Sequence, residues 1–294
     1  MKSLRKVFFI AKKCGFGTAI FYLYYSIELG IINWVTAKRD KDETIPKMYA
    51  VLFQLDNETI RIENIEYIKT KLAEEKYVYL KTNPDSSDIL IFKDVIINGE
   101  YKDVVSIYNR FFMKPAKYII DCGCNIGLTS IYFSLSYPEA KFLCIEPFKT
   151  NADSIKLNFD SVGLKNFTLL QGGVWDKNSS LFINHSFRDG KEWSISLSET
   201  GNIEDEIPAY SLVDLVKNFN SEIDILKIDI EGAETELFKD PEFSKQFLTN
   251  VKCLAIEIHD EFNIRDTIYE ALVKNNFFYY DFADTTVAIN KKYI

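Results

Sequence analysis

The residues best suited to chemistry lie in a short loop after an apolar run. Asp121, Gly123, Asn125 and Gly127 follow Tyr118–Ile120 in the pattern D-x-G-x-N-x-G, and an amphipathic segment comes next. This order predicts a buried strand, a tight loop and then a helix, whose free N-terminal N–H groups can bind a ligand. The loop has neither the G-x-G-x-x-G spacing of dinucleotide folds nor the G-x-x-x-x-G-K-[ST] pattern of phosphate loops.

A second acid follows at a spacing typical of a nucleotide-binding βαβ unit. The apolar run Lys141–Ile145 ends in Glu146, roughly 20 residues after the loop, where a carboxylate can accept both ribose hydroxyls. Asp121, ahead of the first glycine, would repel a pyrophosphate but could pair with an ammonium group. The two acids together predict S-adenosylmethionine, which carries a ribose and a cationic amino-acid end, as the cofactor.

A third loop follows the apolar run Phe167–Leu170. Its paired glycines permit close approach of the backbone, and Gly172, Val174 and Trp175 would flank the adenine. The alternative is a glycine-rich turn whose tryptophan belongs to the core.

Acids and a histidine end the next two apolar runs. Asp229 and Glu231 follow Ile223–Ile228, and an extended chain would point their side chains the same way; Glu257 and His259 repeat this arrangement one run later. We expect these four residues to face the acceptor, with His259 and Glu231 as candidates for a general base or a hydroxyl-orienting group.

Other roles are open for the same residues. His259 could instead be a packed, hydrogen-bonded side chain or a metal ligand. Asp229, Glu231 and Glu257 offer oxygen ligands, so a divalent metal that polarises a sugar diol is an alternative, although we expect no metal. The sequence Cys122-x-Cys124 has the wrong spacing for a zinc site.

The elements that must position these residues alternate from Lys117 onward. This alternation predicts an α/β fold with a mainly parallel sheet and helices on both faces, in which ligands bind beyond the carboxyl ends of the strands. The expected strands are Tyr118–Ile120, Phe142–Ile145, Phe167–Leu170, Ile223–Ile228, Val251–Ile258 and a final region Phe277–Ile289, and expected helices include Thr129–Leu135 and Thr150–Phe159.

The sequence before the first motif has a different character. Residues 1–70 are expected to form a mostly helical extension, and residues 71–294 the catalytic domain with its lead-in strands. Basic residues flank the apolar stretch 16–35, which carries Glu28 at its middle. We expect a helix that docks on protein or lies on a membrane surface rather than a membrane span or signal peptide, and it could support a homo-oligomer or peripheral membrane contact.

Shorter features of this region also give predictions. The strand expected first is 51–55, and the apolar spacing within Glu58–Glu75 predicts a helix. Ile89–Phe92 and Val95–Ile97 are expected to be short strands.

Composition narrows the class of partner. A formal net charge of −8 disfavours a nucleic-acid substrate held through its phosphates. The five cysteines are an odd number and fall mostly in apolar runs, which is typical of a reduced, cytoplasmic protein; association with a membrane would come from the N-terminal segment.

The motif set as a whole resembles the FkbM family of S-adenosylmethionine-dependent methyltransferases. The resemblance rests on IIDCGCNIGLTSIYFS, CIEPF, QGGVWD, LKIDIEGAETELF and AIEIH, with a similar lead-in SSDILIFKDVIINGEY that contains Tyr101. It extends from about Asp85 to the C-terminus, and the two cysteines that flank Gly123 depart from the usual small or apolar residues. The positions that match the family's motifs are Tyr101, Asp121, Gly123, Asn125, Gly127 and Glu146 on the cofactor side, and Lys227, Asp229, Glu231, Gly232, Glu234, Glu257 and His259 beyond them.

The resemblance implies a Rossmann-like class I methyltransferase that methylates a hydroxyl of a sugar, glycan or small metabolite. Two alternatives belong to other classes: an oxidoreductase that binds NAD(P) or a nucleotide sugar, and a non-catalytic protein that keeps the cofactor pocket. The missing G-x-G-x-x-G disfavours the first, and acids at every expected strand end disfavour the second.

Overall fold

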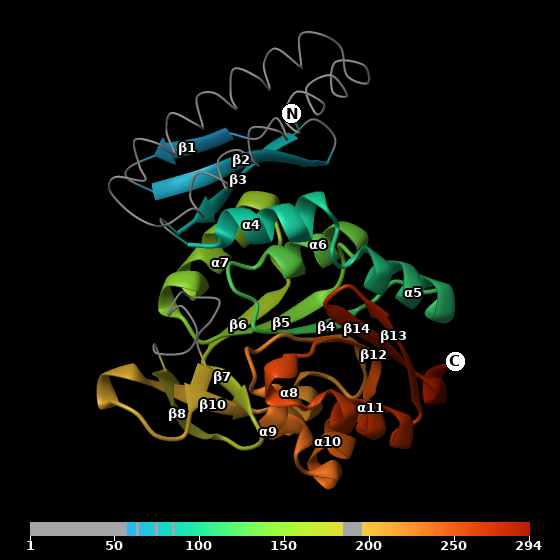
Figure 1. Ribbon diagram of the computed structural model, residues 1–294. Helices are drawn as coiled ribbons and strands as arrows, with labels where there is room; N and C mark the ends of the chain where they lie inside the picture. Colours follow the sequence, from blue (N-terminus) through green and yellow to red (C-terminus); the bar gives the residue numbers. More distant parts are fainter. Residues whose placement is uncertain (1–57, 63–64, 74–75, 84–85, 185–195) are drawn as a thin grey trace, which may run out of the picture. The chain divides into compact units, whose positions relative to one another are not determined.

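A computed structural model describes residues 58–62, 65–73, 76–83, 86–184 and 196–294 (Figure 1). The expectations for the first 57 residues, including the apolar stretch 16–35 and the strand 51–55, lie outside the described residues. Within the described part, no helix is both long and apolar enough to cross a bilayer.

A seven-stranded sheet forms the centre of the fold, in the order β13-β14-β12-β11-β4-β5-β6. Its strands are β4 (Tyr118–Cys122), β5 (Lys141–Glu146), β6 (Phe167–Gln171), β11 (Ile223–Ile228), β12 (Val251–Glu257), β13 (Phe277–Phe282) and β14 (Thr285–Asn290). β12, β11, β4, β5 and β6 pair in parallel, whereas β14 and β13 form an antiparallel hairpin at the edge. The chain proceeds outward from β4 in both directions, so ligands are expected beyond the carboxyl ends of β4 and β11.

Helices cover both faces of this sheet, as predicted (Figure 1). The helices are α5 (Lys102–Phe112), α6 (Leu128–Ser136), α7 (Lys149–Val162), α8 (Leu212–Phe219), α9 (Glu234–Phe238), α10 (Pro241–Leu248) and α11 (Arg265–Lys274), with short 3-10 turns at Ile203–Asp205, Asp260–Phe262 and Lys291–Tyr293. Every residue of β11 is buried, which explains its almost continuous apolar sequence. The six strand regions predicted from Lys117 onward are confirmed, and the last of them is the hairpin of β13 and β14.

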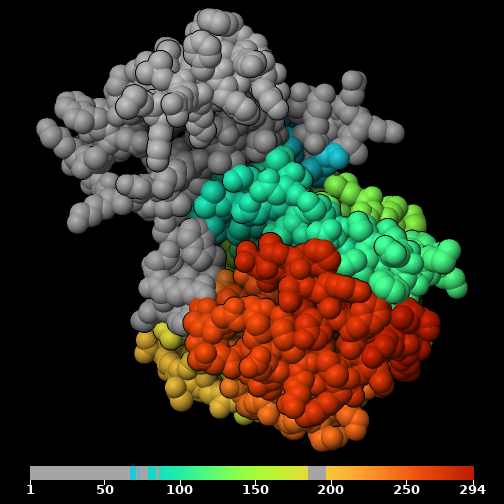
Figure 2. Space-filling model, turned by 45° about the vertical axis from the view of Figure 1, so that its right-hand side comes forward, coloured from blue at the N-terminus to red at the C-terminus, as the bar shows by residue number. Residues whose placement is uncertain are grey.

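Helix α5 packs beside the C-terminal hairpin. The rings of Phe111 and Phe278 lie 5.1 Å apart, and the two segments adjoin in the space-filling view (Figure 2). The hydroxyl of Tyr108 donates to Asp224 Oδ1 at 2.8 Å, and the amides of Lys117 and Tyr118 donate to Asp224 Oδ2. Asp224 is therefore a buried acid of β11 whose hydrogen-bonding capacity is used to hold the lead-in against the sheet.

The expected helix over Glu58–Glu75 is wrong. This region forms an antiparallel meander of β1 (Glu58–Ile62), β2 (Ile65–Ala73) and β3 (Lys76–Thr82). Ile68 and Thr70 are both buried, so buried side chains alternate with a period of two residues, as in a strand. Because Thr70 is polar, this alternation does not appear in the pattern of apolar residues. β3 packs on α7, where Lys81 Nζ donates to Ser154 Oγ at 2.8 Å.

The expected strands at Ile89–Phe92 and Val95–Ile97 are also wrong. The segment is helical, with α4 (Asp88–Phe92) running into a π-helical turn, Lys93–Ile97. Ile89, Phe92 and Val95 are buried at a spacing of three residues, which is a helical period. Because other apolar residues stand beside these three, the sequence of this segment resembles that of a short buried strand.

A second, four-stranded sheet was not predicted from the sequence. It runs in the order β7-β10-β8-β9, with β7 (Gly173–Trp175), β8 (Ser179–Asn184), β9 (Ser196–Ser198) and β10 (Glu206–Ser211). Trp175, Leu181, Ile207 and Ala209 form its buried cluster. β7 starts directly after β6, so this small sheet places the third glycine loop against the end of the central sheet.

Gly123 and Gly127 are required by packing as well as by backbone conformation. Their φ values are +76° and +88°, in the left-handed region. A Cβ on Gly123 would lie 1.8 Å from the carbonyl oxygen of Asp229, and one on Gly127 would lie 2.6 Å from the ring of Phe159. The first loop is thus pressed against the loop that follows β11.

We expect Gly123→Ala to destabilise the protein far more than Gly163→Ala. Gly163 has a similar φ of +80° but nothing within 4 Å of an added Cβ, so its substitution isolates the backbone strain, about 1–2 kcal/mol. At Gly123 the clash with a carbonyl adds about 1–3 kcal/mol or more. Denaturant unfolding of both variants measures the difference, and equal losses would show that the loops can separate without cost.

Candidate active site

A cavity opens where the carboxyl ends of β4, β5, β11 and β12 meet. Residues from several separate segments line it, among them the α4 region, the first loop, the end of β5, the glycine loop after β6 and the ends of β11 and β12. The predicted site residues that line it are Tyr101, Gly123, Asn125, Glu146, Gly172, Val174, Asp229, Glu231 and Glu257.

Glu146 is the centre of one end of the cavity. Its Oε2 accepts from the Asn125 amide at 2.8 Å, and its Oε1 accepts from the Phe148 amide and from Asn151 Nδ2, each at 3.1 Å. The side chain is 3% exposed, and burial raises the pKa of Glu146 to about 8, although the three N–H donors oppose the rise. A carboxylate oxygen has two lone pairs, so Oε2 retains capacity for one hydroxyl donor, whereas both lone pairs of Oε1 are used.

Asp121 does not line the cavity. It is fully buried, its Oδ2 accepts from Ser130 Oγ at 2.7 Å, and its Oδ1 lies 3.4 Å from Lys227 Nζ. The ammonium group that Asp121 meets is therefore that of Lys227. The sequence could not show this, because the partner comes from a strand more than a hundred residues later.

Lys227 joins the first loop to the loop after β11. Its Nζ donates to the carbonyl oxygen of Gly123 at 2.7 Å and lies 3.3 Å from Asp229 Oδ2. Burial alone would lower the pKa of Lys227, but Asp229 and Asp121 together hold it well above its usual value. Lys227 is thus a buried cation at the wall of the cavity, and it fixes both loops.

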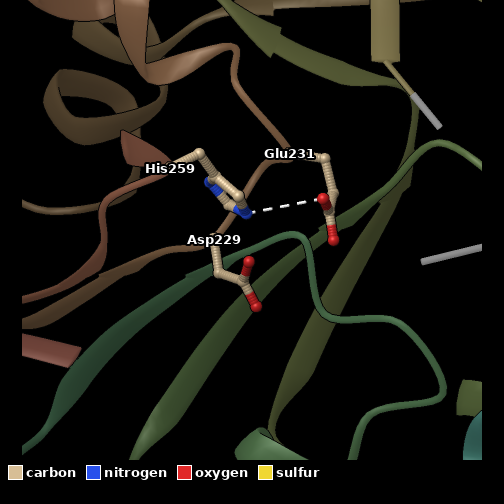
Figure 3. Close-up of side chains that lie close together, drawn as sticks. All are labelled: Asp229, Glu231 and His259. Atoms are coloured by element: carbon tan, nitrogen blue, oxygen red, sulfur yellow. Dashed lines mark ion pairs between the residues drawn. The ribbon is translucent and has the colours of Figure 1, made fainter. Parts of the chain in front are cut away.

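The opposite end of the cavity is acidic. Asp229, Glu231 and Glu257 line it together with Glu100, and His259 lies directly behind them. Figure 3 shows Asp229, Glu231 and His259 directed toward a common space. Burial, and then the nearby Asp229, raises the pKa of Glu257 to about 8 and also raises the pKa of Glu100.

His259 is held between carboxylates. Its Nδ1 lies 3.1 Å from Glu234 Oε1, its Nε2 lies 3.4 Å from Glu231 Oε2, and Glu257 Oε1 is 3.9 Å from Nε2. Burial opposes the charge of the imidazole, but hydrogen bonds to Glu231 and Glu234 raise the pKa of His259 to about 11. At that pKa His259 keeps its proton at neutral pH, which disfavours it as the general base.

Three further predicted residues do not line the cavity. Gly127 packs on Phe159, and His259 is 6% exposed behind Glu231. Trp175 belongs to the core of the small sheet, where its Nε1 is 3.4 Å from Glu199 Oε1, as in the alternative considered for the third loop.

Sequence reasoning missed several lining residues. Ile91, Asp94, Val95, Glu100, Phe148, Asn151 and Leu197 line the cavity without having been singled out. Asn151 lies in the first turn of α7, which begins shortly after Glu146, and a polar residue at that place was an available signal. The wall formed by α4 could not be expected while that segment was taken for a strand.

The sheet order and a cavity at its switch point define the class: a Rossmann-like class I methyltransferase. A family model described as the methyltransferase FkbM domain matches residues 121–284, and the chain belongs to that family. The family and the fold imply S-adenosylmethionine as the methyl donor.

Two curated proteins are similar to this chain in sequence. Methyltransferase sdnD of Sordaria araneosa is 27% identical over 212 residues, which cover 60% of this chain and 80% of that protein. Ribosomal RNA small subunit methyltransferase G of Leuconostoc citreum is 21% identical over 154 residues, covering 52% of this chain and 58% of its own length.

Solved structures show more distant similarity. The METTL16 methyltransferase domain matches with a TM-score of 0.42 at 10% identity, covering 67% of this chain and 68% of that one. An rRNA methylase from Streptococcus thermophilus matches with a TM-score of 0.40 at 11% identity, covering 64% of this chain and 94% of that one.

Proposed function

We propose that this methyltransferase transfers the methyl group of S-adenosylmethionine to a hydroxyl of a sugar, glycan or small metabolite. The observation that carries the proposal is the polarity of the cavity, which has a hydrogen-bonded carboxylate, Glu146, at one end and the acids Asp229, Glu231 and Glu257 at the other. Carboxylates accept hydrogen bonds from hydroxyl groups, whereas they repel phosphates. An acidic acceptor end therefore favours a neutral, hydroxylated substrate over a nucleic acid.

The residues at the other end fit the cofactor. Glu146 Oε2 has a free lone pair for a ribose hydroxyl, and Ile126, Phe148 and Val174 offer apolar surface for a purine ring. When bound, S-adenosylmethionine supplies a methyl group on a positively charged sulfur. The chain's own contribution is to hold the acceptor oxygen in line with that group and to exclude water.

The acidic end would orient the acceptor and take its proton. The hydroxyl oxygen gains the methyl group and loses a proton, so a proton acceptor must lie beside it. We assign that role to Glu257, because its carboxylate lines the cavity while its contact with His259 Nε2 is the long one, at 3.9 Å. Glu231 remains paired with His259 and would orient the hydroxyl.

The function is tested by incubation of the protein with methyl-labelled S-adenosylmethionine and a panel of neutral sugars, glycans and hydroxylated metabolites. We expect label in an ether linkage that resists mild base. Label found instead in RNA, in an amine or in a base-labile ester would contradict methylation of a sugar, glycan or metabolite hydroxyl while leaving methyl transfer intact.

We expect Glu146→Ala to weaken nucleoside binding by about 1.5–3 kcal/mol, the usual worth of hydrogen bonds to a charged group. The suitable ligand is 5′-methylthioadenosine, which keeps the adenine and ribose but has no amino-acid end. Because the ionised carboxylate is the stronger acceptor, the wild-type affinity should rise as the pH rises through about 8, the pKa of Glu146.

Glu146→Gln is the matched control for that titration. It keeps the shape of the side chain and removes the ionisation, so its affinity should not vary over the same pH range. Calorimetric titration gives both quantities. An affinity that is unchanged in a folded Glu146→Ala variant would show that this carboxylate does not hold the ribose.

A further inference from the structure

Asp229, Glu231 and His259 bring three potential ligand atoms together at the acidic end of the cavity. One oxygen of each carboxylate and one ring nitrogen of His259 all lie within 4.8 Å of one another (Figure 3). They come from the loops beyond the adjacent parallel strands β11 and β12. We propose that these three residues bind a divalent cation, a proposal that deepens the proposed function and rests on it for the cation's role toward the acceptor.

The orientation of His259 supports this assignment. Glu234 is fully buried, and its Oε1 accepts from the Ile230 amide at 3.1 Å while it also faces His259 Nδ1. A buried carboxylate thus fixes the ring through Nδ1 and directs Nε2 toward Glu231. Histidines that bind metals are commonly oriented in this way by a carboxylate that is not itself a ligand.

The charges around the cluster point to a cation rather than an anion. Glu257 Oε1 lies 3.9 Å from His259 Nε2, so a third cavity-lining carboxylate borders the ligand atoms. Like charges at such distances repel, and a dication that displaces the proton from His259 Nε2 would offset the repulsion in its place. A mixed set of two carboxylates and one imidazole suits Mn²⁺ and related first-row ions better than it suits Ca²⁺.

The cluster is also accessible from the cavity. The side chains of Asp229 and Glu231 are 28% and 26% exposed, and both line the cavity, whereas His259 behind them is 6% exposed. An ion held here would have its remaining coordination positions on the cavity side. It could then bind and polarise an acceptor oxygen.

Titration of the metal-stripped, full-length protein with Mn²⁺, followed by electron paramagnetic resonance of the free ion, tests the site without reference to activity. We expect saturable binding of one ion per chain. Glu234→Gln should weaken it roughly 10–100-fold, the usual effect of losing an outer carboxylate, and Asp229→Asn and Glu231→Gln should weaken it further. Asp260→Asn is the matched control, because this neighbouring acid is 67% exposed and pairs with Arg265 instead.

Binding of S-adenosylhomocysteine and the unfolding midpoint show whether each variant is folded, and Glu234→Gln provides the conservative variant if a ligand substitution unfolds the protein. Binding that does not saturate, or that is equal in wild type, Asp229→Asn and Glu234→Gln, would overturn the metal site. Methyl transfer by the metal-free protein would then leave the proposed function standing. Saturable binding without methyl transfer to any hydroxyl would support the site and refute the proposed function.

Discussion

Lys227→Met is expected to lower the free energy of unfolding by about 3–5 kcal/mol, because it removes one partner of a buried ion pair. Asp121 is fully buried, and without Lys227 its Oδ1 would face no cation. The carbonyl oxygen of Gly123 would also lose a donor at 2.7 Å. Chemical denaturation of the purified variant measures the loss.

The double variant Asp121→Asn with Lys227→Met separates charge from packing. Since it removes the stranded carboxylate as well, it should recover part of the stability that the single variant loses. Lys245→Met is the surface control, because its partner Glu242 is 79% exposed and such pairs contribute little. A Lys227→Met protein as stable as the surface control would mean that water reaches Asp121.

Secondary structure was predicted correctly where the local residue pattern alone determines the element. β11 is buried on both sides, so its apolar run matched the observed strand, Ile223–Ile228. The β1–β3 meander was misassigned because its inward positions include both polar and apolar residues. The α4 segment was misassigned because its inward positions lie among other apolar residues. Thr70 and Val95 are buried at periods that only the packing partner reveals.

The residues of the site could likewise be predicted only in part. Glu146, Asp229, Glu231 and Glu257 could be predicted to lie near the cavity, because the carboxyl ends of parallel strands meet at one edge of a sheet. Which acid faces inward could not be predicted in this way. The pairing of Asp121 with Lys227, which lies opposite it on the neighbouring strand β11, depends on register and on side-chain direction, which local spacing does not determine.

Glu257→Gln is expected to lower the rate of methyl transfer by about 10²–10⁴-fold, the usual contribution of a general base. The amide keeps the size of the side chain but cannot take a proton at neutral pH. Cofactor affinity should stay nearly constant, because Glu257 lies at the acidic end of the cavity and Glu146 at the other. Single-turnover measurements separate the chemical step from binding and product release.

Two comparisons show whether that loss belongs to proton transfer. Glu257→Asp retains a carboxylate and should recover part of the rate. If Glu257 only packed against the strand, the charge of the aspartate would give it no higher rate than the glutamine variant. Glu270→Gln, on the surface of α11 with 68% of its side chain exposed, applies the same substitution away from the cavity and should leave the rate unchanged.

If His259→Gln abolished transfer in protein with and without Mn²⁺ while Glu257→Gln remained fully active, the proton would have to pass to the imidazole. The chain would then need to release the histidine from Glu231 and Glu234 before the reaction, because the pair of carboxylates otherwise keeps that ring protonated.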